Sequence, residues 1–377
     1  MELWDRMSET SSLTLRDHIC IRPRLYIGHF GDGSTYESGL YDMLKEILNN
    51  SVDEFRMTGE NRIEVTINDG RVATIRDYGR GIPLEELIHY ACKPYGGEKK
   101  DSERFRRTID PTGLGLKIVN ALSQRFEIQS FQDGNTRKAV FERGQLISDI
   151  TEKTQANNGT CVIFEPDNLF FGSYRFHTDI VQNILRHIAY MNVGLSIGFM
   201  GQHICSNHGV KDLLEARLTS DTLYPVIHLK GKDIEIAFTH VDEYDDIYYS
   251  FVNGHETPLG GTHLEAFKYY ITRTIHFFYD RFKPADILPG IVAVVSTQVQ
   301  DPVFESQTKT KLGSYSMVPD GISIKKYIGD FIKQEVYHYL YTHADIAEAL
   351  DRKMIKNRCK RKGVSILITK SDKVLLL

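Results

Sequence analysis

The chain has 377 residues, of which 41% are hydrophobic and 25% are charged, the proportions of an ordinary globular protein. This length exceeds the roughly 250 to 300 residues at which one hydrophobic core usually stops growing, so we expect two domains. The 46 Lys and Arg residues nearly balance 50 Asp and Glu, and the net charge of −4 excludes strong nonspecific binding of nucleic acid by the whole chain.

The five cysteines are scattered and lack the paired spacing of a zinc or thiol redox site, so we interpret them as reduced and mostly buried. The N-terminus is acidic and has no apolar signal core, and no apolar run approaches the roughly 18 residues of a membrane helix. We therefore expect a cytoplasmic location and no membrane partner.

The first part of the chain is predicted to be an arm followed by a domain. Residues 1–22 are polar and loosely patterned, and we expect this arm to lie outside the core. Residues 23–216 form the first predicted domain. It starts with a helix over residues 36–55 and continues with strands over 62–68 and 71–77.

A charged loop over residues 94–112 has the composition of a mobile lid. A glycine turn, Gly113-Leu114-Gly115, follows it and leads into a helical pattern. The elements predicted after this turn are a helix over residues 117–123 and strands over 126–132 and 136–141.

Residues 217–377 form the second predicted domain. The elements predicted for it are strands over 234–240, 247–252 and 290–296, helices over 263–282 and 324–355, and strand-like ends over 364–368 and 374–377. Mixed strands and helices in both domains predict the α+β fold class.

The helix over residues 36–55 carries the most informative pattern, because Glu46, Asn50 and Asp53 share one of its faces. Metal-assisted hydrolysis requires a base for a water molecule and an oxygen ligand for Mg²⁺, and Glu46 and Asn50 provide these groups one turn apart. Each residue alone fits a solvated or hydrogen-bonded position on a helix surface better.

Asp77 ends a predicted strand, and its ionised carboxylate can only accept hydrogen bonds. The exocyclic amine of adenine is a fitting donor, and Gly79 and Gly81 leave room for a flat base against the backbone. Taken alone, Asp77 fits a solvated turn residue better than a base-binding one.

The two common phosphate motifs are missing, since no P-loop string occurs and Gly113-Leu114-Gly115 lacks the third glycine of a dinucleotide fingerprint. What remains is a glycine turn before a helix, whose free N–H groups suit an anionic oxygen. Most such turns only join two elements. The informative observation is therefore that all these groups occur in one order within one domain.

In their order along the chain and in their local sequences, these residues resemble the GHKL superfamily. Its members are type II DNA topoisomerases, histidine kinases, MutL repair proteins and heat-shock chaperones. The match is close to the B subunit of bacterial DNA gyrase or topoisomerase IV. The matching strings are Arg22-Pro23-Arg24-Leu25-Tyr26-Ile27-Gly28, Val119-Asn120-Ala121-Leu122-Ser123, Gly159-Thr160, Gly260-Gly261-Thr262-His263 and Ser306-Gln307-Thr308-Lys309.

The resemblance implies a role for each residue of the pattern. Glu46 is implied to be the general base and Asn50 the Mg²⁺ ligand, with Asp77 as the adenine anchor that Thr160 supports through water. The other implied ATP-contacting residues are Asp53, then Arg80, Gly81, Ile82 and Pro83 around the base, and Gly113, Leu114 and Gly115 at the phosphates. Gln307 and Lys309 are implied to reach the γ-phosphate, where the cation stabilises phosphoryl transfer.

The resemblance also implies an architecture and partners. The fold implied is the GHKL or Bergerat ATP-binding α/β sandwich, followed by a smaller α/β transducer domain with a long C-terminal helix. ATP binding is implied to close a homodimer, the N-gate clamp of a type II topoisomerase, with residues 1–22 of each copy crossing to the other. Hydrolysis is implied to release the clamp.

The chain departs from the family pattern in the lid. Glu98 follows Gly96-Gly97 where lysine is common, Phe105 replaces a common tyrosine, and residues 109–112 replace a glycine-rich stretch. These changes keep open an ATP-binding dimerisation or regulatory protein of low turnover, and a MutL-like repair ATPase is a further alternative. No Glu-Gly-Asp string of a metal-binding cleavage domain occurs, so cleavage of DNA is expected to need that domain and an A-type subunit.

The long C-terminal helix ends in clustered cations, for which two interpretations remain open. The cations either make weak, local contacts with DNA phosphates, or they form a solvated helix end that suits the helix dipole. The cluster consists of Lys353, Lys356, Arg358, Lys360, Arg361 and Lys362.

Overall fold

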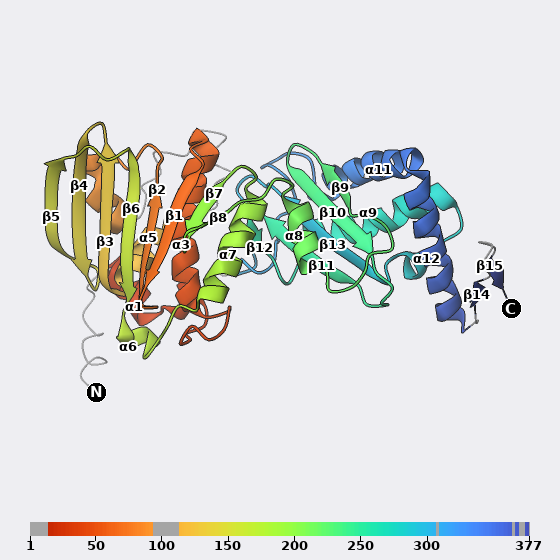
Figure 1. Ribbon diagram of the computed structural model, residues 1–377, viewed down its shortest axis with the longest axis horizontal. Helices are drawn as coiled ribbons and strands as arrows, with labels where there is room; N and C mark the ends of the chain where they lie inside the picture. The colour runs from red at the N-terminus through yellow and green to blue at the C-terminus, as the bar shows by residue number, and fades with distance from the viewer. Residues whose placement is uncertain (1–13, 93–112, 307–308, 364–365, 369–373, 377) are drawn as a thin grey trace. The chain divides into compact units, whose positions relative to one another are not determined.

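The computed structural model describes residues 14–92, 113–306, 309–363, 366–368 and 374–376 (Figure 1). The chain divides into two compact units. The first contains the chain up to Ala189 together with Gly194–Cys205, and the second contains Tyr190–Val193 and the chain from Ser206 onward. Both units mix helices and strands, which confirms the expected α+β class.

An eight-stranded sheet forms the first unit, in the order β5-β4-β3-β6-β2-β1-β7-β8. Neighbouring strands are antiparallel except for β1 and β7, which are parallel. The strands are β1 (Arg62–Asn68), β2 (Val72–Asp77), β3 (Ser123–Gln132), β4 (Asn135–Glu142), β5 (Gln145–Lys153), β6 (Gly159–Pro166), β7 (Ser196–Phe199) and β8 (Gln202–Ile204).

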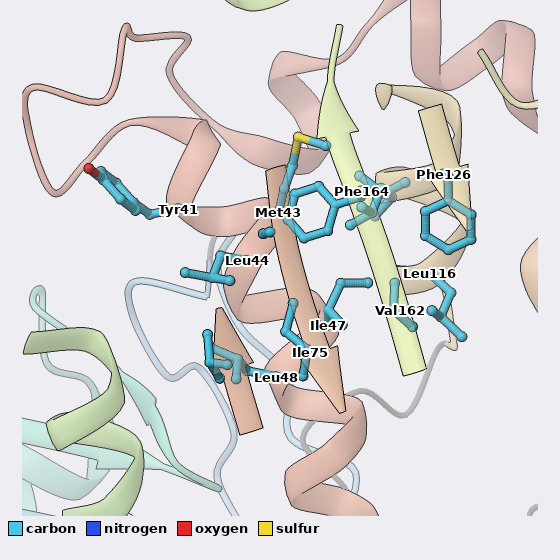
Figure 2. Packing of buried hydrophobic residues seen from close by; sticks show 14 of the residues in the cluster. Tyr41, Met43, Leu44, Ile47, Leu48, Ile75, Leu116, Phe126, Val162 and Phe164 are labelled. Atoms are coloured by element: carbon cyan, nitrogen blue, oxygen red, sulfur yellow. The ribbon is translucent and has the colours of Figure 1, made fainter. Parts of the chain in front are cut away.

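Helices of the first unit pack on one face of this sheet. They are α1 (Leu15–Ile21), α2 (Arg24–Ile27), α3 (Gly39–Thr58), α4 (Leu87–Cys92), α5 (Gly115–Ala121), α6 (Asn168–Phe171) and α7 (Thr178–Met191), with a 3-10 turn at Leu84–Glu86. Figure 2 shows side chains of α3, among them Leu44, Ile47 and Leu48, against Ile75 of β2 and Val162 of β6. Burying each such aliphatic side chain contributes about 1.5–3 kcal/mol.

The expectation that residues 1–22 lie outside the core is wrong for the part that the structure describes. Leu15–Ile21 form α1, which starts at a capping box between Thr14 and Asp17. Ile19 is fully buried in the core of the first unit. The sequence reads as polar because only one narrow stripe of this short helix is apolar. Residues 1–13 lie outside the described residues.

A five-stranded sheet in the order β12-β11-β13-β10-β9 forms the second unit. Its strands are β9 (Ile227–Lys230), β10 (Ile234–His240), β11 (Ile247–Val252), β12 (His255–Glu256) and β13 (Ile291–Thr297). Strands β11 and β13 are parallel, so a crossover joins them, and α9 (Thr262–Tyr279) provides it.

Both faces of this second sheet are covered, as its near-continuous apolar strands require. On β13, Ala293 and Val295 belong to one hydrophobic cluster, whereas Val292 and Val294 belong to another. The first cluster includes residues of α9, α11 (Ile324–Thr342) and α12 (Ala344–Lys362), and the second includes residues of α8 (Val210–Arg217). The short α10 (Pro284–Ile287) and the strands β14 (Ile366–Ile368) and β15 (Val374–Leu376) complete the described elements.

Two expectations for the second unit need revision. The sequence pattern places residues 210–216 in the first domain, but α8 packs on β10 and β13. The single helix expected over 324–355 is interrupted at His343, whose φ of −123° and ψ of 78° are not helical. The Thr342 hydroxyl donates to the His338 carbonyl at 2.9 Å, and the His343 ring stacks on Tyr339. Such local side-chain bonds compete with the helix ladder.

The cations at the end of α12 hold this helix against its own unit. Lys353 is 3% exposed and donates to the Glu243 carbonyl at 2.9 Å, while Lys356 donates to the Asp242 carboxylate at 2.6 Å. Arg361 donates to Asp286 at 2.9 Å, and Lys360 lies over the ring of Tyr244. These contacts favour a packing role over a solvated helix end. No helix among the described residues is long and apolar enough to cross a membrane.

Candidate functional site

Helix α3 presents the first group of candidate residues. The Ser38 hydroxyl accepts from the Leu40 N–H at its start, and Gly59, with φ of 83°, ends it. Because one face of α3 is buried in the core, Glu46, Asn50 and Asp53 lie together on a partly buried face beside it. The expected common face of these three residues is therefore present.

Asn50 is oriented by its own helix. Its side-chain nitrogen donates to the Glu46 carbonyl at 3.0 Å. Because the nitrogen of the Asn50 amide makes this hydrogen bond, the oxygen of the same amide faces away from the helix backbone. Carboxamide and carboxylate oxygens are the protein ligands that Mg²⁺ takes, so Asn50 suits the expected metal role chemically. No cluster of three His, Cys, Asp or Glu side chains suited to a metal occurs in the described part of the chain.

Asp77 lies at the end of β2 and is only 8% exposed. Its Oδ1 atom accepts from the backbone N–H groups of Gly79 and Thr160, both at 3.1 Å, and its Oδ2 atom accepts from the Ser51 hydroxyl at 3.3 Å. These three donors are all neutral. Ser51 belongs to α3 and follows Asn50 directly, so the structure brings the strand end and the helix together at this point.

Burial raises the pKa of the Asp77 carboxyl above its usual range, against the opposing effects of its backbone hydrogen bonds and of the nearby Arg76 charge. An ionised carboxylate at this position is therefore incompletely compensated by the protein. A ligand that donates a further hydrogen bond would stabilise the charged form. The interpretation of Asp77 as a solvated turn residue, which its local sequence favours, is wrong.

The turn after Asp77 is held by an ion pair with α3. Arg80 donates to Glu54 from its backbone N–H at 2.8 Å and from its guanidinium at 2.9 and 2.8 Å. Burial acts to raise the pKa of Glu54, but the hydrogen bonds and charge of Arg80 outweigh it and lower this pKa. A Cβ atom on Gly79 would overlap the Glu54 side chain, so only glycine allows this close approach.

Gly81, Ile82 and Pro83 follow on the same turn. Gly81 has φ of +78°, and an added Cβ would lie 2.6 Å from the Phe131 carbonyl oxygen. The Ile82 carbonyl accepts from the Ser130 hydroxyl at 2.7 Å, and Pro83 precedes the 3-10 turn. The turn is thus fixed to β3 on one side and to α3 on the other. Arg80, expected near the base, is engaged with Glu54.

The glycine turn expected at the phosphates is partly described. Gly113 has φ of +59°, Leu114 is at the N-cap position of α5 without a side-chain cap hydrogen bond, and Gly115 is the first residue of this helix. Lys117 in α5 is only 4% exposed and donates to the Gly113 carbonyl. The expected lid over residues 94–112 includes Glu98 and Phe105, and it lies outside the described residues, which resume at Gly113.

The residues expected from the second unit are also only partly described. Gln307 lies outside the described residues. Lys309 has φ of +55°, and its ammonium lies 3.1 Å from the His255 Nε2 atom.

Three residues of this region are not among the site residues predicted from the sequence. Ser51 bonds to Asp77, Glu54 pairs with Arg80, and Lys117 is buried at the glycine turn. Lys117 has a visible signal, because it is the one charged residue in the otherwise uncharged helical pattern of residues 114–122. Ser51 and Glu54 have none, since their partners are 26 residues away in the chain.

Two family models match the chain. Residues 35–168 match the model described as histidine kinase-, DNA gyrase B-, and HSP90-like ATPase, and residues 209–364 match the model described as DNA gyrase B. The first match contains α3 and Asp77, and the second covers most of the second unit.

Curated relatives agree with these matches. The chain is 35% identical to the B subunit of DNA topoisomerase 4 from Borreliella burgdorferi, over 95% of this chain and 59% of that protein. It is 32% identical to the B subunit of DNA gyrase from Thermotoga maritima, over 78% of this chain and 51% of that protein. The chain thus spans little more than half the length of these relatives.

Solved structures have the same fold. The 43K ATPase domain of Thermus thermophilus gyrase B, in complex with an aminocoumarin, matches with a TM-score of 0.70 and 27% identity, over 93% of this chain and 96% of that one. The topoisomerase IV ATP-binding domain of Francisella tularensis matches with a TM-score of 0.72 and 22% identity, over 93% and 99% of the two chains. On these matches, the chain belongs to the family of type II DNA topoisomerase B subunits, within the superfamily of gyrase B- and HSP90-like ATPases.

Proposed function

We propose that this chain is the ATP-operated clamp of a type II DNA topoisomerase of the gyrase or topoisomerase IV kind. The first unit is the ATPase domain and the second is the transducer. The observation that carries this proposal is the buried Asp77 carboxylate, held by neutral donors beside the helix that presents Glu46 and Asn50. Family membership supports the same assignment.

Base recognition follows from the chemistry of Asp77. An ionised carboxylate accepts a hydrogen bond from the exocyclic amine of adenine, whereas guanine presents a carbonyl oxygen at the corresponding position. The Thr160 N–H and the Ser51 hydroxyl fix the carboxylate in place before the base arrives. The site therefore favours ATP over GTP. Gly81, Ile82 and Pro83 form the neighbouring wall, with Arg80 placed by Glu54.

Phosphoryl transfer depends mostly on position and charge. The amide oxygen of Asn50 suits Mg²⁺, which usually takes one or two protein oxygens and keeps waters and phosphate oxygens as its other ligands. The ion would neutralise phosphate charge. Glu46 would accept the proton of the attacking water at its carboxylate, and backbone N–H groups at Gly113, Leu114 and Gly115 would receive phosphate oxygens. Asp53 lies on the same face of α3 as Glu46 and Asn50. Gln307 and Lys309 of the transducer would donate hydrogen bonds to the γ-phosphate.

Partners follow from the same proposal. ATP binding closes a homodimer, and changes in DNA topology require a metal-binding cleavage domain and an A-type subunit, which work with this chain in the cytoplasm. Contacts of this chain with DNA are weak and local, because most cations at the end of α12 already bind acceptors of their own unit. The match of residues 209–364 to the DNA gyrase B model favours this proposal over a MutL-like ATPase.

Phosphate release from ATP tests the enzyme assignment. We expect the wild type to release phosphate only with Mg²⁺, and Glu46→Ala to be at least about 100-fold slower, since a positioned general base contributes roughly 10²–10⁴-fold. Glu60→Ala is the matched control, because Glu60 is an exposed carboxylate just beyond α3, and it should retain the wild-type rate. If the wild type is no faster than Glu46→Ala, the low-turnover binding protein replaces the enzyme.

Light scattering during size-exclusion chromatography tests the clamp. We expect a monomer without nucleotide and a dimer with Mg²⁺ and a non-hydrolysable ATP analogue. Asp77→Asn should remain monomeric under both conditions. A dimer of the same stability with and without the analogue would contradict ATP-driven closure.

A further inference from the structure

Arg76 lies on the face of the first sheet opposite to α3, because its neighbours Ile75 and Asp77 in β2 point to the covered face. Its guanidinium carbon lies 4.8 Å from the ring centre of Tyr78 and 4.2 Å from that of Phe131. The Arg62 guanidinium lies on Tyr78 in turn, at 4.7 Å. A stack is therefore formed by the side chains of Arg62, Tyr78, Arg76 and Phe131.

The guanidinium of Arg76 also binds three backbone carbonyls. Its Nη1 atom donates to the carbonyl of Asp77, and its Nη2 atom donates to those of Asn157 and Asn158, at 2.6 and 3.3 Å. One carbonyl belongs to the end of β2, and the other two belong to the turn that enters β6. Arg76 therefore ties these two segments together with charge-assisted hydrogen bonds, which are stronger than neutral ones.

The tied segments are the ones that hold the Asp77 carboxylate. Thr160, two residues after Asn158, donates its N–H to Asp77 Oδ1 at 3.1 Å. Gly159 between them has φ of +131°, and a Cβ there would overlap the Asp77 carbonyl and the Arg76 guanidinium. The Asn158 side chain accepts from the Asp133 N–H at 2.9 Å, so the turn is anchored to the β3–β4 hairpin as well.

We propose that Arg76 is a positioning residue for nucleotide recognition, which sets the place of the Thr160 N–H and of the Asp77 carboxylate from the opposite face of the sheet. Arg76 itself does not touch the nucleotide. Its planar fork is needed because a single group must meet carbonyls from two segments while its faces pack on two rings. This inference rests on the proposed function, since it assumes that Asp77 binds the base.

The first experiment compares Arg76→Gln and Arg76→Lys with the wild type in steady-state ATP hydrolysis. We expect Arg76→Gln to raise KM for ATP about tenfold, with kcat changed less than about twofold, because Glu46 and Asn50 are unaffected. Arg76→Lys keeps the charge and loses the planar fork, so its KM for ATP should lie between that of the wild type and that of Arg76→Gln. Arg125→Gln is the matched control, since Arg125 lies in β3 of the same sheet and donates to the Glu127 side chain; it should behave as the wild type.

Base selectivity is the readout that a merely structural role would not change. A destabilised protein loses active molecules, which lowers apparent kcat for ATP and GTP alike. A displaced carboxylate instead lowers the ratio of kcat/KM for ATP to that for GTP, and we expect a loss of about fivefold or more in Arg76→Gln. If Arg76→Gln does not fold, the same ratio in Arg76→Lys decides the matter.

Asp77→Asn separates this inference from the function on which it rests. If Asp77→Asn binds ATP much more weakly than the wild type while both Arg76 variants keep the wild-type KM and selectivity, the positioning role is wrong and the proposed function stands. If Asp77→Asn binds ATP as the wild type does, the proposed function itself fails. A raised KM with lost selectivity in the Arg76 variants, together with a wild-type Arg125→Gln, supports the positioning role.

Discussion

Asp286 and Asp77 are buried aspartates of different units, and their surroundings differ in kind. Asp286 at α10 is 1% exposed and contacts two guanidiniums, Arg361 at 2.9 Å and Arg358 at 3.8 Å, as well as the Lys283 N–H. Asp77 at the end of β2 is 8% exposed, and within the described part of the chain it accepts hydrogen bonds from neutral groups only. Arg358 and Arg361 form ion pairs with Asp286, whereas no cation among the described residues forms an ion pair with Asp77.

This difference distinguishes a carboxylate with a structural role from a carboxylate that can accept a hydrogen bond from a ligand. The Asp286 contacts join α10 to α12 within the second unit, and no further ligand is required. At Asp77 burial raises the pKa, and the neutral donors together with the nearby Arg76 charge do not fully offset this effect. A buried charge that the chain does not neutralise costs stability, and this cost is retained where a ligand uses the group.

Asp77→Asn should have the largest effect. The amide keeps the shape but repels the donor of the base, so nucleotide affinity should fall on the order of 100-fold, as expected for a hydrogen bond to a charged group. Isothermal titration with an ATP analogue measures it. An unchanged affinity would remove the distinction between the two aspartates.

The same variant should be more stable than the wild type at neutral pH. Because the folded pKa of Asp77 is raised, the unfolded chain loses this proton first, and the wild type becomes less stable as the pH rises through and above about 4. Asp77→Asn removes this cost, and its advantage in thermal unfolding should vanish below that pH. A variant that is less stable at pH 7 would show that Asp77 is well compensated.

Asp286→Ala should have the opposite pair of effects. It leaves Arg358 and Arg361 without their shared acceptor and removes the cap at Lys283, so we expect a loss of about 2 kcal/mol in the free energy of unfolding. Urea unfolding measures this loss. Nucleotide affinity of the folded variant should be unchanged, and a large loss of affinity would contradict the structural role of Asp286.

Glu54→Gln should cost about 1 kcal/mol, because Glu54 is mostly buried whereas its partner Arg80 is largely exposed. The bonds to Arg80 hold the pKa of Glu54 below its usual value against burial, so this stability is present at neutral pH and is lost as the pH falls below about 4.5. Thermal unfolding across this range should show a pH dependence opposite to that of Asp77→Asn. If both variants were stabilised, or both destabilised, relative to the wild type at neutral pH, the contrast between Glu54 and Asp77 would be wrong.

Lys356→Ala should have the smallest effect. Lys356 and Asp242 are 49% and 61% exposed in their side chains, and an exposed ion pair of this kind contributes at most about 0.5 kcal/mol. Urea unfolding should therefore hardly distinguish this variant from the wild type. A loss comparable with that of Asp286→Ala would show that the whole basic end of α12 acts as one network.

Much of the site could be predicted from the sequence because it depends on local spacing. The common face of Glu46, Asn50 and Asp53 needs only the helical repeat, and the place of Asp77 needs only the end of a strand. Thr160 is expected from the resemblance to act through water, and the structure shows its N–H bonded directly to Asp77. The resemblance to known ATPases links groups that local spacing alone leaves unrelated.

The remaining features depend on contacts between distant parts of the chain. The partners of Glu54, Lys353 and Arg361 are 26, 110 and 75 residues away, so these charges read as solvated from their neighbours in sequence. Ile19 is buried only because the sheet provides a surface for α1. The interruption at His343 arises from side-chain bonds of Thr342 and His343, which a helical apolar pattern does not reveal.

A crystal structure with Mg²⁺ and a non-hydrolysable ATP analogue tests the central claim most directly. We expect the exocyclic amine of adenine to donate to Asp77, the Asn50 amide oxygen to bind the metal ion, and Glu46 to face the γ-phosphate. A nucleotide bound elsewhere, with the Asp77 carboxylate still surrounded only by Ser51, Gly79 and Thr160, would contradict the account.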